Sequence, residues 1–345
     1  MRNIYLFTPW REQGLSYDAK VIEQIAKDIN IHVIITYYKK RKVVWDCEFT
    51  PINNIRNNIQ KDDILFCFER FPENHLQSIS EKCSNLYLMI NYEYFEKSNL
   101  KYYKLFRKIF CKSMVAYKGC QSFGLKNIKY KPWILYDFPI LSNAQNFVGD
   151  KVQVLFNGGT GGFKDRRNFG AVVELIKNYP DEDVHFTIKF IEHIRRWSKA
   201  ILKRNWKYLK SNPRVTVIQK DMNREEYIQF LQGFDLNLAP SKYEGFGLTL
   251  LEAMYMRIPT ITIDASPMNE IIEDNISGRC VKAFLIGYRR SQPVFDVYPE
   301  LFQQAFIKSV KNRDELIKMK DNCVSKIEEK RQEFVSYFSG LFSNE

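Results

Sequence analysis

Glu244 and Glu252 lie eight positions apart in a segment that reads as a glycine-bearing loop followed by a helix. A short apolar strand over 234–240 precedes this segment, and a β-branched strand over 258–264 follows it. A turn between a strand and a helix directs backbone N–H groups and the positive end of the helix dipole toward one point. Such a point is suited to binding a phosphate.

Glu252 borders the apolar stripe of the predicted helix. Leu248, Leu251 and Tyr255 recur at the spacing of a buried helical face. An ionised carboxylate buried there without donors would cost on the order of several kcal/mol. One interpretation is a glutamate paired with a nearby lysine or capping a backbone N–H. The other is that the hydroxyls of a bound ligand, such as a ribose diol, supply the donors.

A second glycine-rich turn, Asn157 to Asn168, follows a predicted strand and carries four glycines in five positions, then several cations. It matches neither the nucleoside-triphosphate P-loop nor the dinucleotide fingerprint, and a plain tight turn is the alternative. Because arginine offers bidentate contacts to phosphate oxygens, the glycines and cations together favour a diphosphate site. Its candidate residues are Gly158, Gly159, Gly161, Lys164, Arg166 and Arg167.

These segments resemble retaining glycosyltransferases of the GT-B fold, in particular the large family 4 group. Residues 244–252 resemble that group's E-x7-E motif, and residues 234–241 and 268–278 resemble the segments on either side. In the glycine-rich loop, Arg166 stands at the family's arginine and Arg167 where a lysine is usual. The resemblance in sequence runs from about residue 152 to 282. Over the first 150 residues, only the order of predicted strands and helices is similar.

The resemblance implies transfer of a hexose from a nucleotide-diphosphate sugar, UDP- or GDP-sugar, to an acceptor hydroxyl of a polysaccharide, glycan or lipid-linked molecule. Glu252 would bind the ribose hydroxyls and Glu244 would lie near the donor sugar. The acceptor would attack the face from which the diphosphate leaves, with a diphosphate oxygen taking its proton, without a metal or other cofactor. Backbone groups holding the diphosphate and sugar would be those of Gly245, Phe246, Gly247, Leu248 and Thr249.

The first part of the chain departs from the family pattern at two positions. Glu93 stands where many relatives have a histidine near the donor sugar, and a carboxylate at a helix start is the alternative reading. Gly14 is the one glycine of a loop that usually carries two, and is expected to approach donor or acceptor closely. With Glu244, Arg167 and Lys164, Glu93 completes the set of catalytic candidates.

Apolar strands alternating with helices indicate parallel sheets covered on both faces. The pattern restarts near residue 150, which predicts two Rossmann-like domains that face a cleft: residues 1–145 on the acceptor side and 146–345 for the donor. By resemblance, the last helix, 314–338, crosses back to the first domain. Predicted strands are 3–8, 31–37, 63–68, 86–90, 114–117, 152–156, 184–190, 215–218, 236–239 and 260–263, with helices at 16–28, 75–82, 102–112 and 168–178.

The chain has 345 residues, seven scattered cysteines and a net charge of +12. The cysteines lack metal or disulfide spacing, and no apolar run is long enough for a membrane span, which predicts a cytoplasmic protein. Asp181 and Asp183 mimic a D-x-D metal motif, but they precede a strand and are expected to be solvated loop charges.

Two basic segments, Lys101–Lys112 and Arg195–Lys210, project as amphipathic helices. Each is either an ordinary surface helix or a peripheral contact with an anionic membrane. The alternatives to a transferase are a nucleotide-sugar epimerase or hydrolase, and a non-catalytic protein that binds nucleic acid or membrane. Glu244, Glu252 and the glycine-rich basic loop favour the transferase, and no specific nucleic-acid partner is expected.

Overall fold

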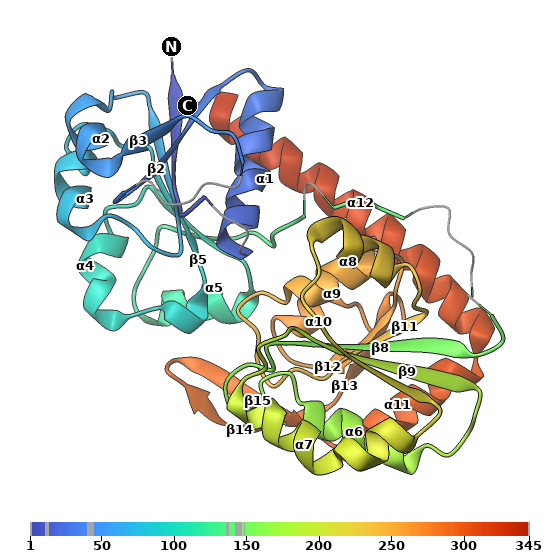
Figure 1. The fold of residues 1–345 in the computed structure, drawn as a ribbon. Helices are drawn as coiled ribbons and strands as arrows, with labels where there is room; N and C mark the ends of the chain where they lie inside the picture. Colours follow the sequence, from blue (N-terminus) through green and yellow to red (C-terminus); the bar gives the residue numbers. More distant parts are fainter. Residues whose placement is uncertain are drawn as a thin grey trace. The chain divides into compact units, whose positions relative to one another are not determined.

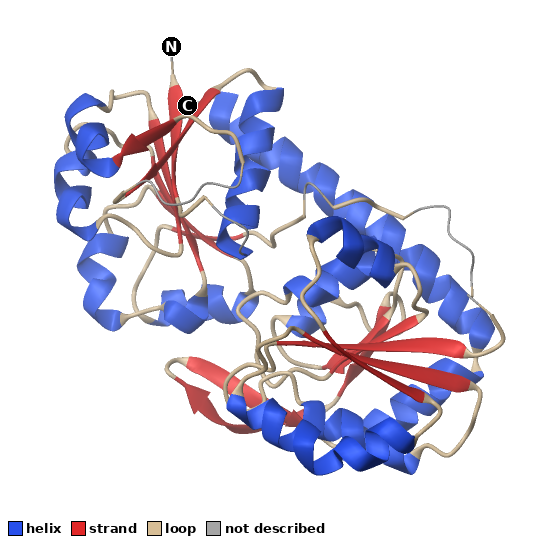
Figure 2. Cartoon of the chain, viewed as in Figure 1, coloured by secondary structure: helices blue, strands red, loops and turns tan. Residues whose placement is uncertain are grey.

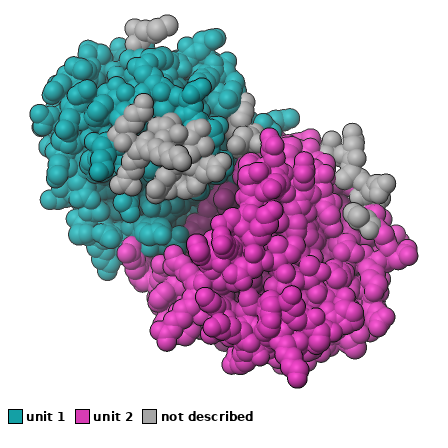
Figure 3. Space-filling model, viewed as in Figure 1, with its two compact units in different colours: residues 1–137, 329–345 teal, residues 138–328 magenta. Residues whose placement is uncertain are grey.

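The computed structural model describes residues 2–10, 14–39, 45–135, 138–141, 147 and 149–343. The chain forms two compact units, one of residues 1–137 with 329–345 and one of residues 138–328 (Figure 3). The domain boundary predicted between residues 145 and 146 lies outside the described residues.

The first unit is a seven-stranded parallel sheet with the strand order β3-β2-β1-β4-β5-β6-β7 (Figures 1 and 2). Every residue of the central strand β4 and of its neighbour β5 is buried, as expected for strands covered on both faces. The strands are β1 (Asn3–Phe7), β2 (His32–Tyr37), β3 (Phe49–Pro51), β4 (Ile64–Phe68), β5 (Leu86–Ile90), β6 (Lys108–Cys111) and β7 (Ile128–Tyr130). The helices are α1 (Gly14–Asp28), α2 (Ile52–Asn58), α3 (Glu73–Ser80), α4 (Leu100–Tyr103) and α5 (Met114–Ser122), with short 3-10 turns at Tyr92–Tyr94 and Lys97–Asn99.

Two element predictions in this unit are wrong. The predicted helix 102–112 contains strand β6, and the predicted strand 114–117 opens helix α5. Residues 109–111 are fully buried and β6 pairs with β5 and β7, so Ile109 and Phe110, taken for part of a helical stripe, belong to a buried strand. Ser113 then starts α5 by accepting a hydrogen bond from the Ala116 N–H. The segment Lys101–Lys112 therefore does not form a basic helical face.

The second unit is a six-stranded parallel sheet with the order β10-β9-β8-β11-β12-β13. Figure 1 shows α6, α7 and α11 on one face of this sheet and α8, α9 and α10 on the other. The strands are β8 (Val152–Gly159), β9 (Val184–Phe190), β10 (Val215–Gln219), β11 (Leu236–Ala239), β12 (Thr260–Ile263) and β13 (Gly278–Val281). The helices are α6 (Phe169–Asn178), α7 (Arg196–Ser211), α8 (Arg224–Leu231), α9 (Leu248–Tyr255), α10 (Met268–Ile271) and α11 (Pro299–Lys311).

The strand order of the second unit reverses at β8. The chain proceeds from β8 outward through β9 to β10, then returns to the other side of β8 and proceeds through β11 to β13. The loops after β8 and β11 therefore diverge from neighbouring strand ends, which is where open α/β sheets bind ligands. These two loops contain the glycine-rich basic segment and Glu244.

Two further elements complete the fold. An antiparallel hairpin of β14 (Ala283–Arg289) and β15 (Gln292–Val297), which the sequence did not predict, lies outside both parallel sheets (Figure 2). Helix α12 covers Arg313–Ser343, and its residues from 329 onward belong to the first unit. There Phe334 and Phe338 pack against Trp133, with ring centroids 4.9 and 5.7 Å away.

Candidate functional site

The loop after β8 is held in an unusual backbone shape. Gly159, Gly161 and Gly162 have φ values of 52°, 80° and 75°, a region that glycine adopts without strain. A Cβ atom at Gly161 would also collide with Ser198 at the start of α7. The glycines are thus required by the turn itself and by its close packing against a helix.

Asp165 anchors this loop. Its carboxylate accepts a hydrogen bond from the Ser198 hydroxyl at 2.8 Å and another from the Gly170 N–H at 3.1 Å. The first bond ties the loop to α7 and the second ties it to the first turn of α6. Asp165, which was not predicted as a site residue, thus holds the loop directly before Arg166 and Arg167.

Arg167 connects the two loops of the site. Its guanidinium donates to the Glu244 carboxylate and, at 3.2 Å, to the Thr249 hydroxyl. The Arg166 guanidinium lies 3.9 Å from the other Glu244 oxygen. The predicted residues Arg166, Arg167, Glu244 and Thr249 are therefore neighbours, although up to 83 positions separate them in the chain.

The protonation of this cluster follows from burial and charge. Glu244 is 3% exposed, and burial raises the pKa of its carboxyl, but Arg167 and Arg166 outweigh burial and hold that pKa below its ordinary value. Burial lowers the pKa of the Arg167 guanidinium, and the Glu244 carboxylate opposes that change. We conclude that Glu244 is an ionised carboxylate paired with arginine.

Glu252 lies on α9 in a different environment. Its carboxylate accepts a hydrogen bond from the Tyr227 hydroxyl at 3.1 Å and lies 3.7 Å from the Arg224 guanidinium. Glu252 is 6% exposed, and burial raises its pKa to about 7, against the opposing effects of Arg224 and Tyr227. The first interpretation given for Glu252 was a lysine pair or a backbone cap. The partners found are instead an arginine and a tyrosine.

Helix α9 begins next to these carboxylates. Gly247 is its N-cap residue with a φ of 100°, and a Cβ there would lie 2.9 Å from the Ile271 side chain. Phe246 is buried and Gly245 is half-buried, while Leu248 and Thr249 form the first turn. Since the first N–H groups of a helix have no partner within the helix, this turn presents donors beside Arg167.

Three predicted residues are not among the contacts of this cluster. Lys164 is exposed, and its ammonium lies 5.7 Å from the Phe163 ring centroid. Glu93 and Gly14 belong to the first unit, Glu93 in the turn after β5 and Gly14 at the start of α1. Among the described residues, no atom would lie within 4 Å of a Cβ at Gly14, so nothing in that part of the chain requires glycine there.

Several side chains that support Glu252 were not predicted from the sequence. Tyr227 and Arg224 lie on α8, and the Tyr227 hydroxyl accepts a hydrogen bond from the Asn157 amide at 2.7 Å. The side-chain oxygen of Asn157 in turn accepts a hydrogen bond from the Gly159 N–H at 3.2 Å. Glu252 is thereby linked to the glycine-rich loop through one tyrosine and one asparagine. Only Asn157, which opens the glycine-rich segment, carried a sequence signal.

The D-x-D sequence has a local structural role. The Lys311 ammonium lies 2.6 Å from an Asp181 oxygen and 2.9 Å from an Asp183 oxygen, and Asp183 also accepts from the Tyr179 hydroxyl at 2.7 Å. Within the described part of the chain, no group of three or more His, Cys, Asp or Glu residues is arranged to hold a metal.

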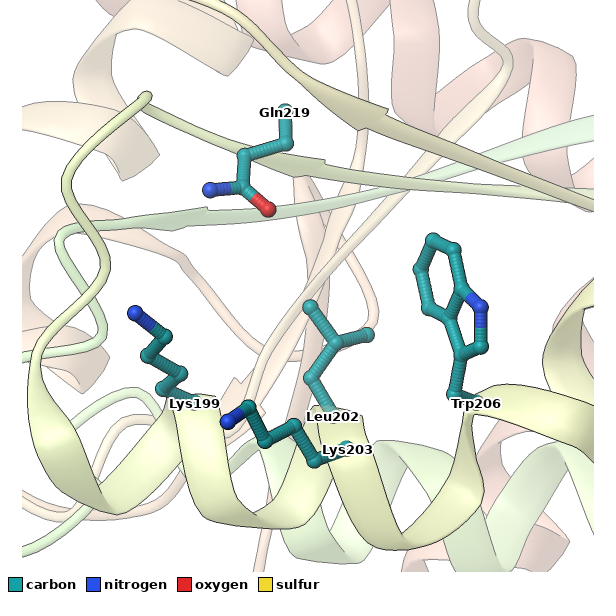
Figure 4. A pocket seen from close by; sticks show the side chains of 5 residues that line it. All are labelled: Lys199, Leu202, Lys203, Trp206 and Gln219. Atoms are coloured by element: carbon teal, nitrogen blue, oxygen red, sulfur yellow. The ribbon is translucent and has the colours of Figure 1, made fainter.

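Helix α7 forms a cationic surface on the second unit. No acidic residue occurs from 195 to 211, and all seven cations of that stretch are exposed. Trp197 and Trp206 are 49% and 43% exposed. A hollow of about 310 Å³ lies between this helix and β10. It is lined by Lys199, Leu202, Lys203, Trp206 and Gln219 (Figure 4). None of the described helices has both the length and the apolar composition needed to cross a bilayer.

Comparisons with known proteins agree with this architecture. Residues 198–285 match the family described as Glycosyl transferases group 1. A comparison with curated protein sequences finds no match. The matched segment includes Glu244, Glu252 and α8.

Solved structures share the fold over the whole chain. HepE of Anabaena in complex with UDP and glucose has a TM-score of 0.71 at 12% identity, covering 100% of this chain and 99% of HepE. A variant of TarM of S. aureus, in complex with fondaparinux, alpha-GlcNAc-glycerol and UDP, has a TM-score of 0.73 at 11% identity. The match covers 99% of this chain and 100% of TarM. Sucrose-phosphate synthase of Thermosynechococcus elongatus gives 0.70 at 12%, covering 100% of both chains. The predicted GT-B fold class is confirmed, and so is the resemblance to group 1 glycosyltransferases.

Proposed function

We propose that this chain, which has the GT-B fold and a group 1 glycosyltransferase segment, transfers a hexose from a UDP- or GDP-sugar to an acceptor hydroxyl with retention of configuration. The observation that carries the proposal is the cluster of Arg167, Glu244 and Glu252 at the point where the strand order reverses. Two buried carboxylates, two arginines and a glycine-rich turn meet the needs of a nucleoside diphosphate in charge and in hydrogen bonding.

The proposed donor contacts divide between the two carboxylates. Glu252, buried and supported by one tyrosine and a guanidinium 3.7 Å away, would accept hydrogen bonds from the ribose hydroxyls. The first turn of α9 and the Arg166 and Arg167 guanidinium groups would hold the diphosphate. Glu244, which orients Arg167, would lie near the hydroxyls of the donor sugar.

In the proposed reaction, the bond between the anomeric carbon and the diphosphate oxygen breaks as the acceptor oxygen forms a bond on the same face of the sugar. The departing diphosphate oxygen accepts the acceptor proton, so no separate base is needed. The two arginines and the helix N-terminus stabilise the charge that develops on the diphosphate. Because these groups are already positioned, we propose a reaction that does not depend on a metal.

Donor identity can be tested by thermal unfolding with UDP-, GDP-, ADP- and TDP-sugars, each with and without EDTA. A ligand at about 100 times its dissociation constant adds about 2.7 kcal/mol to the free energy of unfolding. We expect UDP- or GDP-sugars to stabilise the wild type, with no effect of EDTA. Absence of any nucleotide effect would favour a non-catalytic binding protein. Release of free sugar or an epimer without an acceptor would favour a hydrolase or epimerase.

We also propose that α7 contacts an anionic membrane surface, which would bring the site to a lipid-linked acceptor. Each Lys or Arg near such a surface contributes about 1 kcal/mol to binding, and exposed indoles suit the interfacial region. The test is sedimentation with phosphatidylglycerol vesicles and with phosphatidylcholine vesicles. We expect the wild type to bind selectively to the phosphatidylglycerol vesicles and the double variant Lys203→Glu/Lys207→Glu to lose this binding. Equal recovery of wild type and variant with anionic vesicles would contradict this role.

A further inference from the structure

The β14–β15 hairpin contacts both loops of the candidate donor site. Asp296 near the end of β15 accepts hydrogen bonds from the Asn168 amide and from the Lys242 ammonium, both at 2.8 Å. Asn168 closes the glycine-rich loop directly after Arg167, and Lys242 lies two residues before Glu244. One carboxylate therefore links the ends of the two segments that form the Arg167–Glu244 pair.

Backbone contacts reinforce this link. The Phe295 N–H donates to the Lys242 carbonyl at 2.9 Å, and the Lys242 N–H donates to the Arg166 carbonyl at 2.8 Å. Strand β15, the Glu244 loop and the glycine-rich loop are thereby connected in series. Lys242 therefore contacts both β15 and the glycine-rich loop through its backbone, in addition to the direct contact between Asp296 and Asn168.

The other end of β15 holds Glu244 directly. Gln292 is 1% exposed, and its amide N–H donates to the Glu244 backbone carbonyl. On the adjoining strand, the Arg289 guanidinium donates to the Tyr243 hydroxyl at 3.0 Å, and its centre lies 5.5 Å from the Phe163 ring centroid. The hairpin thus contacts Asn168, which follows Arg167, and also Glu244 and the residue before it.

We propose that the β14–β15 hairpin is a clamp that fixes the glycine-rich loop against the Glu244 loop, with Asp296 and Gln292 as positioning residues for Arg167 and Glu244. This inference rests on the proposed function of the site. The match to the group 1 family ends at residue 285, so Gln292 and Asp296 lie beyond the matched segment. The clamp therefore extends the donor site to residues that the family match does not include.

A purely structural role would give a different result from a positioning role. If the hairpin only stabilised the unit, its variants would lower the unfolding temperature while the folded protein kept its donor affinity and kcat. If it positions the loops, the folded variants lose affinity for the nucleoside diphosphate and lose kcat, because Arg167 no longer meets the diphosphate in a fixed geometry.

The experiment compares Asp296→Ala, Asp296→Asn and Lys242→Met with the control Tyr288→Ala, whose side chain is 68% exposed on the same hairpin. UDP and GDP binding is measured by calorimetry, and kcat and KM are measured with the donor that stabilises the wild type. We expect Asp296→Ala to weaken binding by roughly tenfold, as for a lost hydrogen bond to a charged group. Asp296→Asn, which keeps an acceptor for Asn168, should lose less, and Tyr288→Ala should match the wild type.

The Asp296–Lys242 contact gives an internal check. Lys242→Met should add little to Asp296→Asn, since both remove the same ion pair. Wild-type affinity and kcat in folded Asp296→Ala would overturn the clamp. If the wild type itself binds no nucleoside diphosphate, the proposed function fails instead, so the two failures are distinguishable.

Discussion

The two glutamates of the E-x7-E segment are buried to nearly the same extent, yet their surroundings act on their carboxyl groups in opposite directions. Glu244 contacts two guanidinium groups, and its pKa is held below the ordinary value despite burial. Glu252 has one guanidinium at 3.7 Å and one phenol hydroxyl, and burial raises its pKa to about 7. Burial alone therefore does not determine the charge: Glu244 has a guanidinium in direct hydrogen-bond contact, whereas the guanidinium closest to Glu252 lies 3.7 Å away.

This difference separates the roles of the two residues. The Glu244 charge is balanced by the protein, so this residue can orient Arg167 before any ligand arrives. The Glu252 charge is only partly balanced, and an incompletely compensated buried carboxylate favours ligands that bring hydrogen-bond donors. A ribose diol is such a ligand. Four predictions test this contrast.

The largest effect is expected from Arg167→Met. This change leaves the Glu244 carboxylate buried with Arg166 at 3.9 Å as its remaining cation. Removing one partner of a buried ion pair costs about 3–5 kcal/mol. Chemical unfolding at pH 7.5 should show a loss of this size, together with loss of transferase activity. Lys164→Met is the matched control, because Lys164 is exposed, and its stability should be unchanged. A loss below about 1 kcal/mol for Arg167→Met would contradict the buried pair.

Glu252→Gln should separate stability from binding. A carboxyl whose pKa is raised in the folded state binds its proton more tightly there than in the unfolded chain. The wild type therefore loses stability as pH rises from about 4.5 to about 7, by up to about 3 kcal/mol. The neutral amide removes this cost, so Glu252→Gln should be at least as stable as the wild type at pH 8 while binding the donor more weakly. A variant that is less stable at pH 8 would refute the raised pKa.

Donor affinity should depend on pH through Glu252. If the ionised carboxylate accepts hydrogen bonds from the ribose hydroxyls, donor affinity is at its maximum above the pKa of about 7. Well below that pKa, the affinity falls about tenfold for each pH unit. Calorimetry of the nucleoside diphosphate at pH 5.5, 6.5 and 8 measures this slope, and Glu252→Gln should remove the Glu252 contribution. The same slope in Glu252→Gln and the wild type would assign the titration to another group, such as the diphosphate.

The contrast between the carboxylates was only partly accessible from sequence. The glycine-bearing turn before the Glu252 helix and the glycines and cations of 158–167 each indicated a phosphate site, because each motif is local in the chain. Tyr227 lies 25 positions before Glu252, and the Asn157 amide that contacts it lies 70 positions earlier still. Their meeting depends on β8 and β11 being neighbours in the sheet, which no local pattern encodes.

The remaining sequence predictions divide along similar lines. Strands such as β4 and β5 were predicted because a parallel strand buried on both faces is a continuous apolar run. The same kind of run at 109–111 was assigned to a helix, since periodicity cannot separate a short buried strand from a buried helical segment. The hairpin was missed because β14 carries exposed apolar residues, including Phe284, Leu285 and Ile286, and shows no alternating pattern.

The smallest of the four effects is expected from Tyr227→Phe. The Tyr227 hydroxyl donates to Glu252, and burial raises the pKa of this phenol well above its usual value, so the group remains a donor throughout the accessible pH range. Loss of that donor disfavours the ionised carboxylate by about 1 kcal/mol. The pH midpoint of donor binding should therefore move upward, with the affinity at pH 8.5 nearly unchanged. Phe230→Tyr on the same helix is the control, and its midpoint should stay at the wild-type value. A uniform loss of affinity at every pH in Tyr227→Phe would instead mean that the hydroxyl contacts the donor itself.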